Sequence, residues 1–201
     1  NYKEQARLYI GADLPPPNSP PFEGEVVSRI KEILEITRGR TLVLFTSHSL
    51  LRRAAEDIYV EGVEILRQGE ADSYHLVEEL RSGENTALFG TYTFWQGIDV
   101  PGDALKYVVI TRLPFAVPDE PVAEARMELL ERLGRDPFRD YSLPRAAITL
   151  KQGFGRLIRS STDTGTVCIL DSRIATRHYG KYFMDSLPKI KIVTGLEDII
   201  F

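Results

Sequence analysis

The sequence predicts an α/β fold in which a mostly parallel β-sheet is covered by helices on both faces. Short apolar runs rich in β-branched residues, such as "TLVLFTS" (41–47), alternate along the chain with longer segments whose apolar residues recur at helical spacing. Alternation of this kind is typical of parallel strands joined by crossover helices. With 201 residues, of which 43% are hydrophobic, the chain can bury the core of such a domain.

The first part of the chain is expected to lie outside the sheet. The stretch "LPPPNSPPF" (14–22) contains five prolines, which disfavour both helices and sheet ladders, so we predict that residues 1–23 form an extended connector. The chain begins with Asn1 rather than Met. We therefore expect it to be a piece of a longer protein, joined through this connector to an upstream domain.

The remaining elements are predicted in order from hydrophobic periodicity and turn residues. The segment 23–39 places Val26, Val27, Ile30, Ile33 and Leu34 on one helical face and ends at Gly39. Further helices are expected at 48–62, 72–84, 119–134, 143–160 and 173–188. Strands are expected at 41–47, 63–68, 86–92, 105–115, 165–171 and 189–195.

Composition excludes several classes of protein. No apolar run approaches the roughly 18 residues of a membrane span, and no signal peptide opens the chain. The single cysteine, Cys168, cannot form an internal disulfide or a cysteine-rich metal site, and the apolar run around it predicts a buried strand position. These features favour a cytoplasmic location.

The charge of the chain is unevenly distributed. The formal net charge of −4 argues against a general polyanion binder. Residues 145–191, however, hold nine Lys or Arg against three Asp or Glu. This bias indicates either a solvated surface or a local phosphate-binding face.

We expect three stretches with candidate functional residues to lie at the carboxyl ends of strands, where ligands of such folds bind. The hydroxyls of "FTSHS" (45–49) suit a helix cap, and the same helix start could alternatively face a nucleic-acid phosphate. In "GTYTFWQGIDVPG" (90–102), Asp99 caps a turn or offers a carboxylate to a sugar, a metal-bound water or an arginine. Trp95 is either a core anchor or a base-stacking residue.

A third stretch, "LKQGFGRLIRS" (150–160), places Arg156 and Arg159 three residues apart, on one face of the expected helix. Each guanidinium can bind phosphate oxygens bidentately, and Gln152 adds an amide at the same edge. Gly153 and Gly155 are costly within a helix and suggest close approach of another group. The alternative is an exposed helix with surface salt bridges.

Two arginines can stabilise charge in phosphoryl transfer, but they cannot hold a nucleotide alone. The sequence contains no GxxxxGK[ST] phosphate loop and no paired-acid box after a strand. "YGKY" (179–182) lacks the required spacing and hydroxyl. The arginine-bearing segment is therefore expected to act on a nucleotide held by another domain.

Together, "LVLFTSH", "GTYTFWQGIDVPGDALKYVVITRLPF" and "LKQGFGRLIRSSTDTGTVCILDSRI" resemble helicase motifs IV, V and VI of the DinG branch of XPD-like DNA helicases. The resemblance covers essentially the whole chain. It implies a second RecA-like motor domain at 24–201, with an insert at about 117–143. The missing partner would be the first motor domain of the same polypeptide.

The resemblance also implies site residues. Arg156, Arg159 and Gln152 look like the motif VI residues that act on the γ-phosphate. The other implied positions are nucleotide-side residues, namely Gly97, Asp99 and Gly155, positions near the DNA backbone, namely Thr46, Ser47, His48 and Thr91, and the aromatic pair Phe94 and Trp95 between the two sites.

The function implied is part of an ATP-dependent DNA helicase that moves 5′ to 3′ on single-stranded DNA. ATP and Mg²⁺ would be bound mainly by the first motor domain, which in many relatives also carries an iron–sulfur cluster. This fragment alone is expected to be inactive.

Two alternatives remain open at this stage. One is a non-catalytic nucleic-acid-binding or interaction module on a degenerate motor fold. The other is a self-sufficient nucleotide-binding or sugar-phosphate-binding α/β domain, which would need a glycine-rich loop that "FTSHSLL" does not supply.

Overall fold

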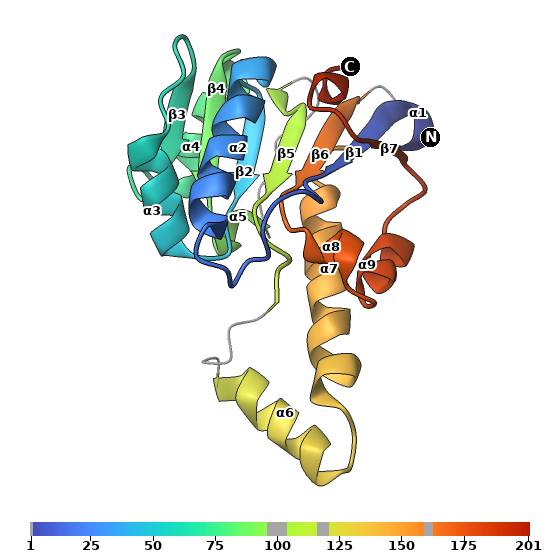
Figure 1. The fold of residues 1–201 in the computed structure, drawn as a ribbon. Helices are drawn as coiled ribbons and strands as arrows, with labels where there is room; N and C mark the ends of the chain where they lie inside the picture. Colours follow the sequence, from blue (N-terminus) through green and yellow to red (C-terminus); the bar gives the residue numbers. More distant parts are fainter. Residues whose placement is uncertain (1, 96–103, 116–120, 159–162) are drawn as a thin grey trace.

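The computed structural model describes residues 2–95, 104–115, 121–158 and 163–201 of the chain. Within these residues one seven-stranded, all-parallel sheet has the order β3-β4-β2-β5-β6-β1-β7 (Figure 1). The strands are β1 (Ala6–Ile10), β2 (Thr41–Leu44), β3 (Glu64–Arg67), β4 (Thr86–Gly90), β5 (Tyr107–Ile110), β6 (Gly165–Ile169) and β7 (Lys191–Val193). The predicted α/β fold with a parallel sheet is confirmed.

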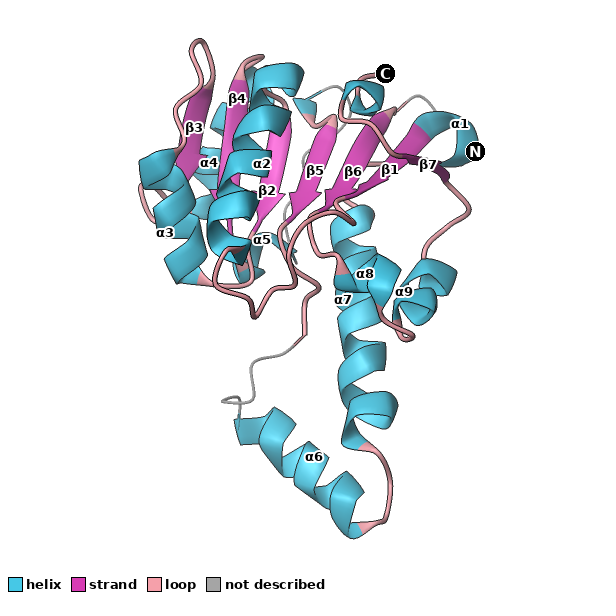
Figure 2. Ribbon diagram, viewed as in Figure 1, coloured by secondary structure: helices cyan, strands magenta, loops and turns pink. Residues whose placement is uncertain are grey.

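Helices cover both faces of the sheet, and each face has its own apolar cluster (Figure 2). One face packs against α2 (Phe22–Thr37) and α3 (His48–Asp57), and the other against α4 (Ser73–Ser82), α5 (Tyr92–Trp95), α7 (Leu143–Phe154) and α9 (Gly180–Ser186). Successive side chains of a strand enter opposite clusters, because side chains alternate across a pleated sheet. Leu42 and Leu44 of β2 belong to one cluster, and Val43 lies in the other.

Strand β1 corrects the sequence prediction for residues 1–23. Ala6–Ile10 pairs in parallel with both β6 and β7, so this segment lies inside the sheet and not in a connector. A short helix, α1 (Tyr2–Gln5), precedes it. Only the proline-rich part after Ile10 is irregular, and its Leu14 is buried against the α2 face. The sequence prediction missed β1 for two reasons. A run of five residues that includes an arginine gives only a weak strand signal, and the strand forms by pairing with residues more than 150 positions away.

Three predicted helices have clearly different bounds in the structure, and the first of them, expected at 48–62, ends at Asp57. The helix expected at 143–160 ends at Phe154, and the backbone then turns, with the Leu157 N–H donating to the Phe154 carbonyl. The helix expected at 173–188 is split into α8 (Arg173–Thr176) and α9. Gly180 begins α9 where a Cβ atom would lie 2.0 Å from the Ile174 carbonyl oxygen, so only glycine allows the two helices to pack this closely.

A helical arm projects beyond the carboxyl ends of the strands (Figure 1). It consists of α6 (Pro121–Arg132), a π-helical segment η2 (Phe138–Ser142) and the first part of α7. The last turns of α7 return to the sheet beside β5. The arm includes most of the segment expected as an insert at about 117–143, and the assignment of that segment as an insert stays a prediction.

The position of Cys168 agrees with the sequence prediction of a buried strand residue. Cys168 lies in β6 with no solvent exposure, and burial raises the pKa of its thiol to about 12, as expected for a strand residue in the apolar interior. The chain ends in a short 3-10 helix, η3 (Glu197–Ile199). No helix in the described ranges combines the length and apolar character that crossing a bilayer would require.

Candidate nucleic-acid and nucleotide interface

The carboxyl edge of the sheet carries two of the three sequence stretches singled out above. The segment after β2 enters α3 and the segment after β4 forms α5, and both leave the same edge because all strands are parallel. The third stretch does not lie at the carboxyl end of a strand, as the sequence predicted, but crosses one face of the sheet. Gly153 lies against Trp95 of α5, and Leu157 lies against Gly165 at the amino end of β6.

The first stretch caps a helix, as the sequence suggested. Ser47 is the N-cap of α3, and its hydroxyl accepts a hydrogen bond from the Leu50 N–H at 3.2 Å. Thr46 is half-buried before it, and His48 is exposed on the first turn. The capping prediction is confirmed, and contact of these residues with DNA stays a prediction.

The residue after β4 is held by a side chain that sequence reasoning missed. The backbone N–H and the hydroxyl of Thr91 both donate to Oε1 of Gln68, at 2.6 and 2.9 Å. Thr91 itself is only 4% exposed. Its donors are therefore occupied from within the protein, and Gln68 lies between Thr91 and the surface. Its position as the last residue of a predicted strand was the only sequence signal for this role.

Gln68 also lines an open hollow of about 540 Å³ at this edge. The hollow is formed by the start of α3 and the turn after β3, and it is lined by His48, Leu51, Arg52, Arg67, Gln68, Gly69 and Glu70. Arg67 pairs with Glu70 at 2.9 Å, whereas Arg52 is exposed and makes no ion pair within the described ranges. The hollow therefore combines the exposed guanidinium of Arg52 with hydrogen-bonding groups.

The aromatic pair of the second stretch is part of the core, and this corrects its assignment to nucleic-acid contact. Phe94 is fully buried and Trp95 is 1% exposed. The Phe94 ring packs over Gly90, where a Cβ atom would lie 2.6 Å from it. A ring enclosed in this way presents no face on which a base could stack.

Trp95 joins the second stretch to the third. A Cβ atom at Gly153 would lie 3.0 Å from two atoms of the indole ring, so the absence of a side chain at 153 lets α7 approach α5 closely. The close approach predicted for Gly153 is present, but the approaching group is Trp95 of the same chain and not a ligand. Gly155 is exposed and ends α7 in an ordinary helical conformation.

Arg156 lies two residues beyond the end of α7, in the turn that follows it. Its side chain is half-buried, and burial lowers the pKa of its guanidinium from the usual value. Gln152 is exposed on the last turn of the helix. The prediction that Arg156 projects from a continuous helical face is therefore wrong, because the helix ends within its glycine pair.

Three predicted site residues, Gly97, Asp99 and Arg159, lie outside the described residues.

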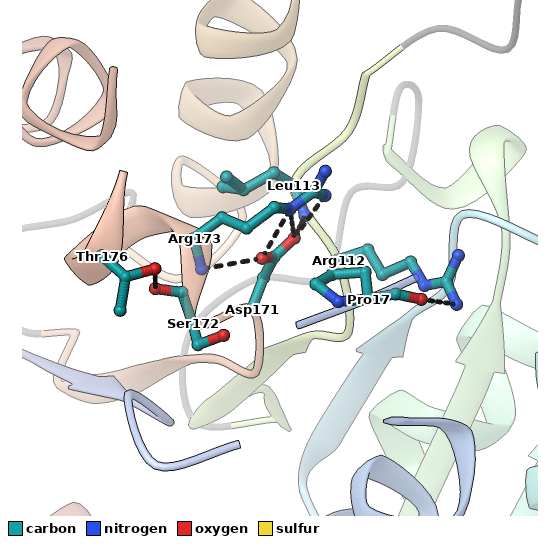
Figure 3. A network of polar contacts seen from close by, with 7 residues as sticks. All are labelled: Pro17, Arg112, Leu113, Asp171, Ser172, Arg173 and Thr176. Atoms are coloured by element: carbon teal, nitrogen blue, oxygen red, sulfur yellow. Dashed lines mark hydrogen bonds and ion pairs between the residues drawn. The ribbon is translucent and has the colours of Figure 1, made fainter. Parts of the chain in front are cut away.

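A buried carboxylate that was not predicted from the sequence organises the neighbouring strand ends. Asp171, which follows β6, is fully buried and accepts the Leu113 N–H at 2.8 Å, and it forms a two-pronged ion pair with Arg173, with Nη2 to Oδ2 at 2.7 Å (Figure 3). Beside it, Arg112 donates to the Pro17 carbonyl at 3.1 Å and lies over the Phe22 ring. These contacts fix the segments that leave β5 and β6 and attach the proline-rich segment to the same edge.

The described residues give no support to a metal centre here: among them, no three His, Cys, Asp or Glu side chains gather as a metal site would require. The chemistry this edge offers is that of guanidinium, amide, hydroxyl and imidazole groups. Such groups bind phosphates, of a nucleotide or of a nucleic-acid strand.

Comparisons with known proteins agree on one family. A family model for the helicase C-terminal domain matches residues 30–190. The ATP-dependent DNA helicase YoaA of Haemophilus influenzae is 41% identical over all 201 residues, which span 31% of its length. The ATP-dependent helicase DinG of Mycobacterium tuberculosis is 41% identical over 90% of this chain and 28% of its own. The chain thus spans about a third of the length of these curated relatives.

Solved structures show the same fold at low sequence identity. Xpd4 of S. tokodaii superposes with a TM-score of 0.67 at 19% identity, over 94% of this chain and 39% of its own. The C-terminal domain of the DEAD-box protein Dbp5 superposes with a TM-score of 0.59 at 18% identity, over 96% of this chain and 92% of its own. The architecture is therefore the RecA-like one expected from the sequence.

Proposed function

The chain belongs to the helicase C-terminal domain family, in its DinG-type branch, and from this premise we propose that it is the second motor domain of an ATP-dependent DNA helicase. In this role it supplies arginines to an ATP site shared with a first motor domain, and it forms part of the track for single-stranded DNA. The whole-chain identity of 41% to a named ATP-dependent DNA helicase supports the assignment.

The junction between Trp95 and Gly153 is the structural observation that carries the proposal. It fastens the end of α7, with Gln152 and the following Arg156, to α5 in a domain whose sequence has no phosphate loop. A guanidinium held in this way can act on a γ-phosphate presented by a neighbouring domain. By the resemblance, Arg159 and Asp99 take part as well.

The proposed mechanism is a cycle of closing and opening between two domains. ATP between the domains draws Arg156 towards the γ-phosphate, and loss of that phosphate releases the contact. A ligand shifts such an equilibrium only by its differential affinity for the two states, which γ-phosphate contacts can supply. Different grip on the DNA strand in the two states then gives movement, and we propose the 5′-to-3′ direction of the branch.

Unwinding assays on the full-length protein test this proposal. With ATP, the protein is expected to displace a strand from a duplex that carries a 5′ single-stranded tail and to leave the matched 3′-tailed duplex intact. The isolated 201-residue chain is expected to hydrolyse no ATP, because it has no phosphate loop to hold the nucleotide. Full-length protein without DNA-stimulated ATPase activity would instead favour a non-catalytic binding module.

A further inference from the structure

The neighbours of Gln68 allow only one of the two orientations of its side-chain amide. Its backbone N–H donates to the Phe89 carbonyl at 2.9 Å, which continues the β3–β4 ladder by one residue. At the end of the side chain, one amide atom faces both the N–H and the hydroxyl of Thr91. A backbone N–H can only donate a hydrogen bond, so the atom facing it must be the amide oxygen.

The other terminal atom of the side chain, which does not face Thr91, is therefore the amide nitrogen. Nε2 of Gln68 makes no hydrogen bond to any other residue in the described ranges, although an NH₂ group carries two donors. The residue lines the hollow at the start of α3, beside His48 and Arg52. An oriented amide donor thus borders the same space as an exposed guanidinium and an imidazole.

This combination suits a phosphodiester oxygen. Glutamine amides and arginine guanidiniums are common donors to nucleic-acid phosphates, and such contacts carry no sequence preference. Glu70 offsets the charge of Arg67 within the hollow, so Arg52 is the cation that a phosphate would meet. The hollow lies at β3, three places in the sheet from β5 where α7 packs, or about 14 Å at the usual strand spacing. A strand phosphate is therefore favoured there over the nucleotide.

We propose that Gln68 binds a phosphate of the single-stranded DNA through its NH₂ group, with Thr91 holding the amide in place and Arg52 supplying the charge. This inference rests on the proposed function, because it adds a contact to the DNA track of the same domain. It also gives Thr91, which is buried, an indirect part in binding: Thr91 orients the amide and Gln68 meets the strand.

The test is a titration of full-length protein into fluorescently labelled oligo-dT, followed by anisotropy at several salt concentrations without nucleotide. Gln68→Met keeps the length of the side chain but removes the donor, and it should raise the Kd about tenfold with an unchanged salt dependence. Arg52→Ala should raise the Kd and reduce the slope of log K against log salt by about 0.7, as for loss of one phosphate contact.

Arg81→Ala is the matched control, because Arg81 is exposed on α4, pairs with Glu78 and does not line the hollow. It should bind oligo-dT as the wild type does. A Kd for Gln68→Met within twofold of the wild type would overturn the inference while leaving the helicase assignment intact. Wild-type protein that does not bind oligo-dT would instead refute the proposed function itself.

Gln68→Glu is the second variant, in case Gln68→Met unfolds the site. A carboxylate still accepts both hydrogen bonds from Thr91 but donates none, so binding should weaken at least as much as in Gln68→Met, and wild-type binding would refute the contact. Repeating the titration with excess ADP distinguishes a phosphate of the DNA strand from a phosphate of the nucleotide. If the hollow binds the strand, the ratio of mutant to wild-type Kd for oligo-dT stays unchanged in ADP. Equal Kd values for mutant and wild type in ADP would refute the assignment of the hollow to the strand.

Discussion

Gly153 allows α7 to pack closely against α5, because a Cβ atom there would lie 3.0 Å from the Trp95 indole ring. A glycine inside a helix is costly, and the inference that something approaches it closely was sound. The approaching group is the Trp95 indole and not a phosphate. Sequence alone could not distinguish a ligand from a side chain 58 positions away, because only the packed fold decides which residue fills the space.

Gly153→Ala is expected to destabilise the domain by about 1–3 kcal/mol, since the new methyl group would lie 3.0 Å from the indole ring. The change can be measured as a shift in the urea midpoint of the protein. Gly24→Ala is the control: Gly24 is exposed in α2 and a Cβ atom there meets only one Arg53 atom at 3.8 Å. That substitution should be neutral or stabilise by up to about 1 kcal/mol. Equal effects at both glycines would contradict the packing role of Gly153.

Other residues were predictable to different degrees. Ser47 followed from the rule that hydroxyl residues precede helices, and Cys168 from its apolar neighbours. Asp171 and Gln68 were not identified, because their partners Leu113 and Thr91 come from other strands. A polar side chain that bonds across the sheet leaves no local pattern in the sequence.

Among the elements, the arm depends on an aromatic cluster at its base. Phe115, just after β5, contacts Phe138 of η2, Tyr179 and Phe183, with ring centroids 5.6 to 5.8 Å apart. Arg173, held by Asp171, lies over the Phe115 ring at 5.4 Å. The cluster thus connects the arm to the strand ends and to α9, which indicates that the arm has a fixed attachment to the motor sheet.

Phe115→Ala should loosen the arm, because it removes the ring shared by these contacts. Loss of about 1.4 kcal/mol or more of local stability corresponds to a tenfold or greater rise in local opening. Trypsin cleavage within the arm, which carries Arg126, Arg132, Arg135 and Arg139, should accelerate accordingly. Leu129→Ala, at an exposed position of α6, should be cleaved as the wild type is. An unchanged cleavage rate in Phe115→Ala would show that other contacts hold the arm.

The elements whose signals are local were predicted, and those that depend on distant pairing were not. Helix α2 followed from its apolar face and its terminal glycine, and β6 from a continuous buried run. Strand β1 was missed because its place between β6 and β7 is decided by residues at the other end of the chain. The early end of α7 was missed because the turn after Phe154 outweighs the helical spacing of the two arginines.

At the scale of the whole molecule, the proposed function makes this chain one of two domains that act together on a nucleotide. Its sheet presents an edge with guanidinium, amide and hydroxyl groups, and its sequence has no phosphate loop. The hollow at β3 and the end of α7 lie at different places on the domain. The domain can therefore serve a DNA strand and a nucleotide at the same time, as a motor that couples hydrolysis to movement requires.

The central claim, that Arg156 completes an ATP site held by another domain, is tested most directly by comparing hydrolysis and nucleotide binding in the full-length Arg156→Ala protein. DNA-stimulated ATP turnover should fall about 10³-fold or more, as for loss of an arginine finger. The Kd for a non-hydrolysable ATP analogue should change by no more than about threefold, since the first motor domain is proposed to hold most of the nucleotide. Arg81→Ala should match the wild type in both. Wild-type turnover by Arg156→Ala would contradict the account.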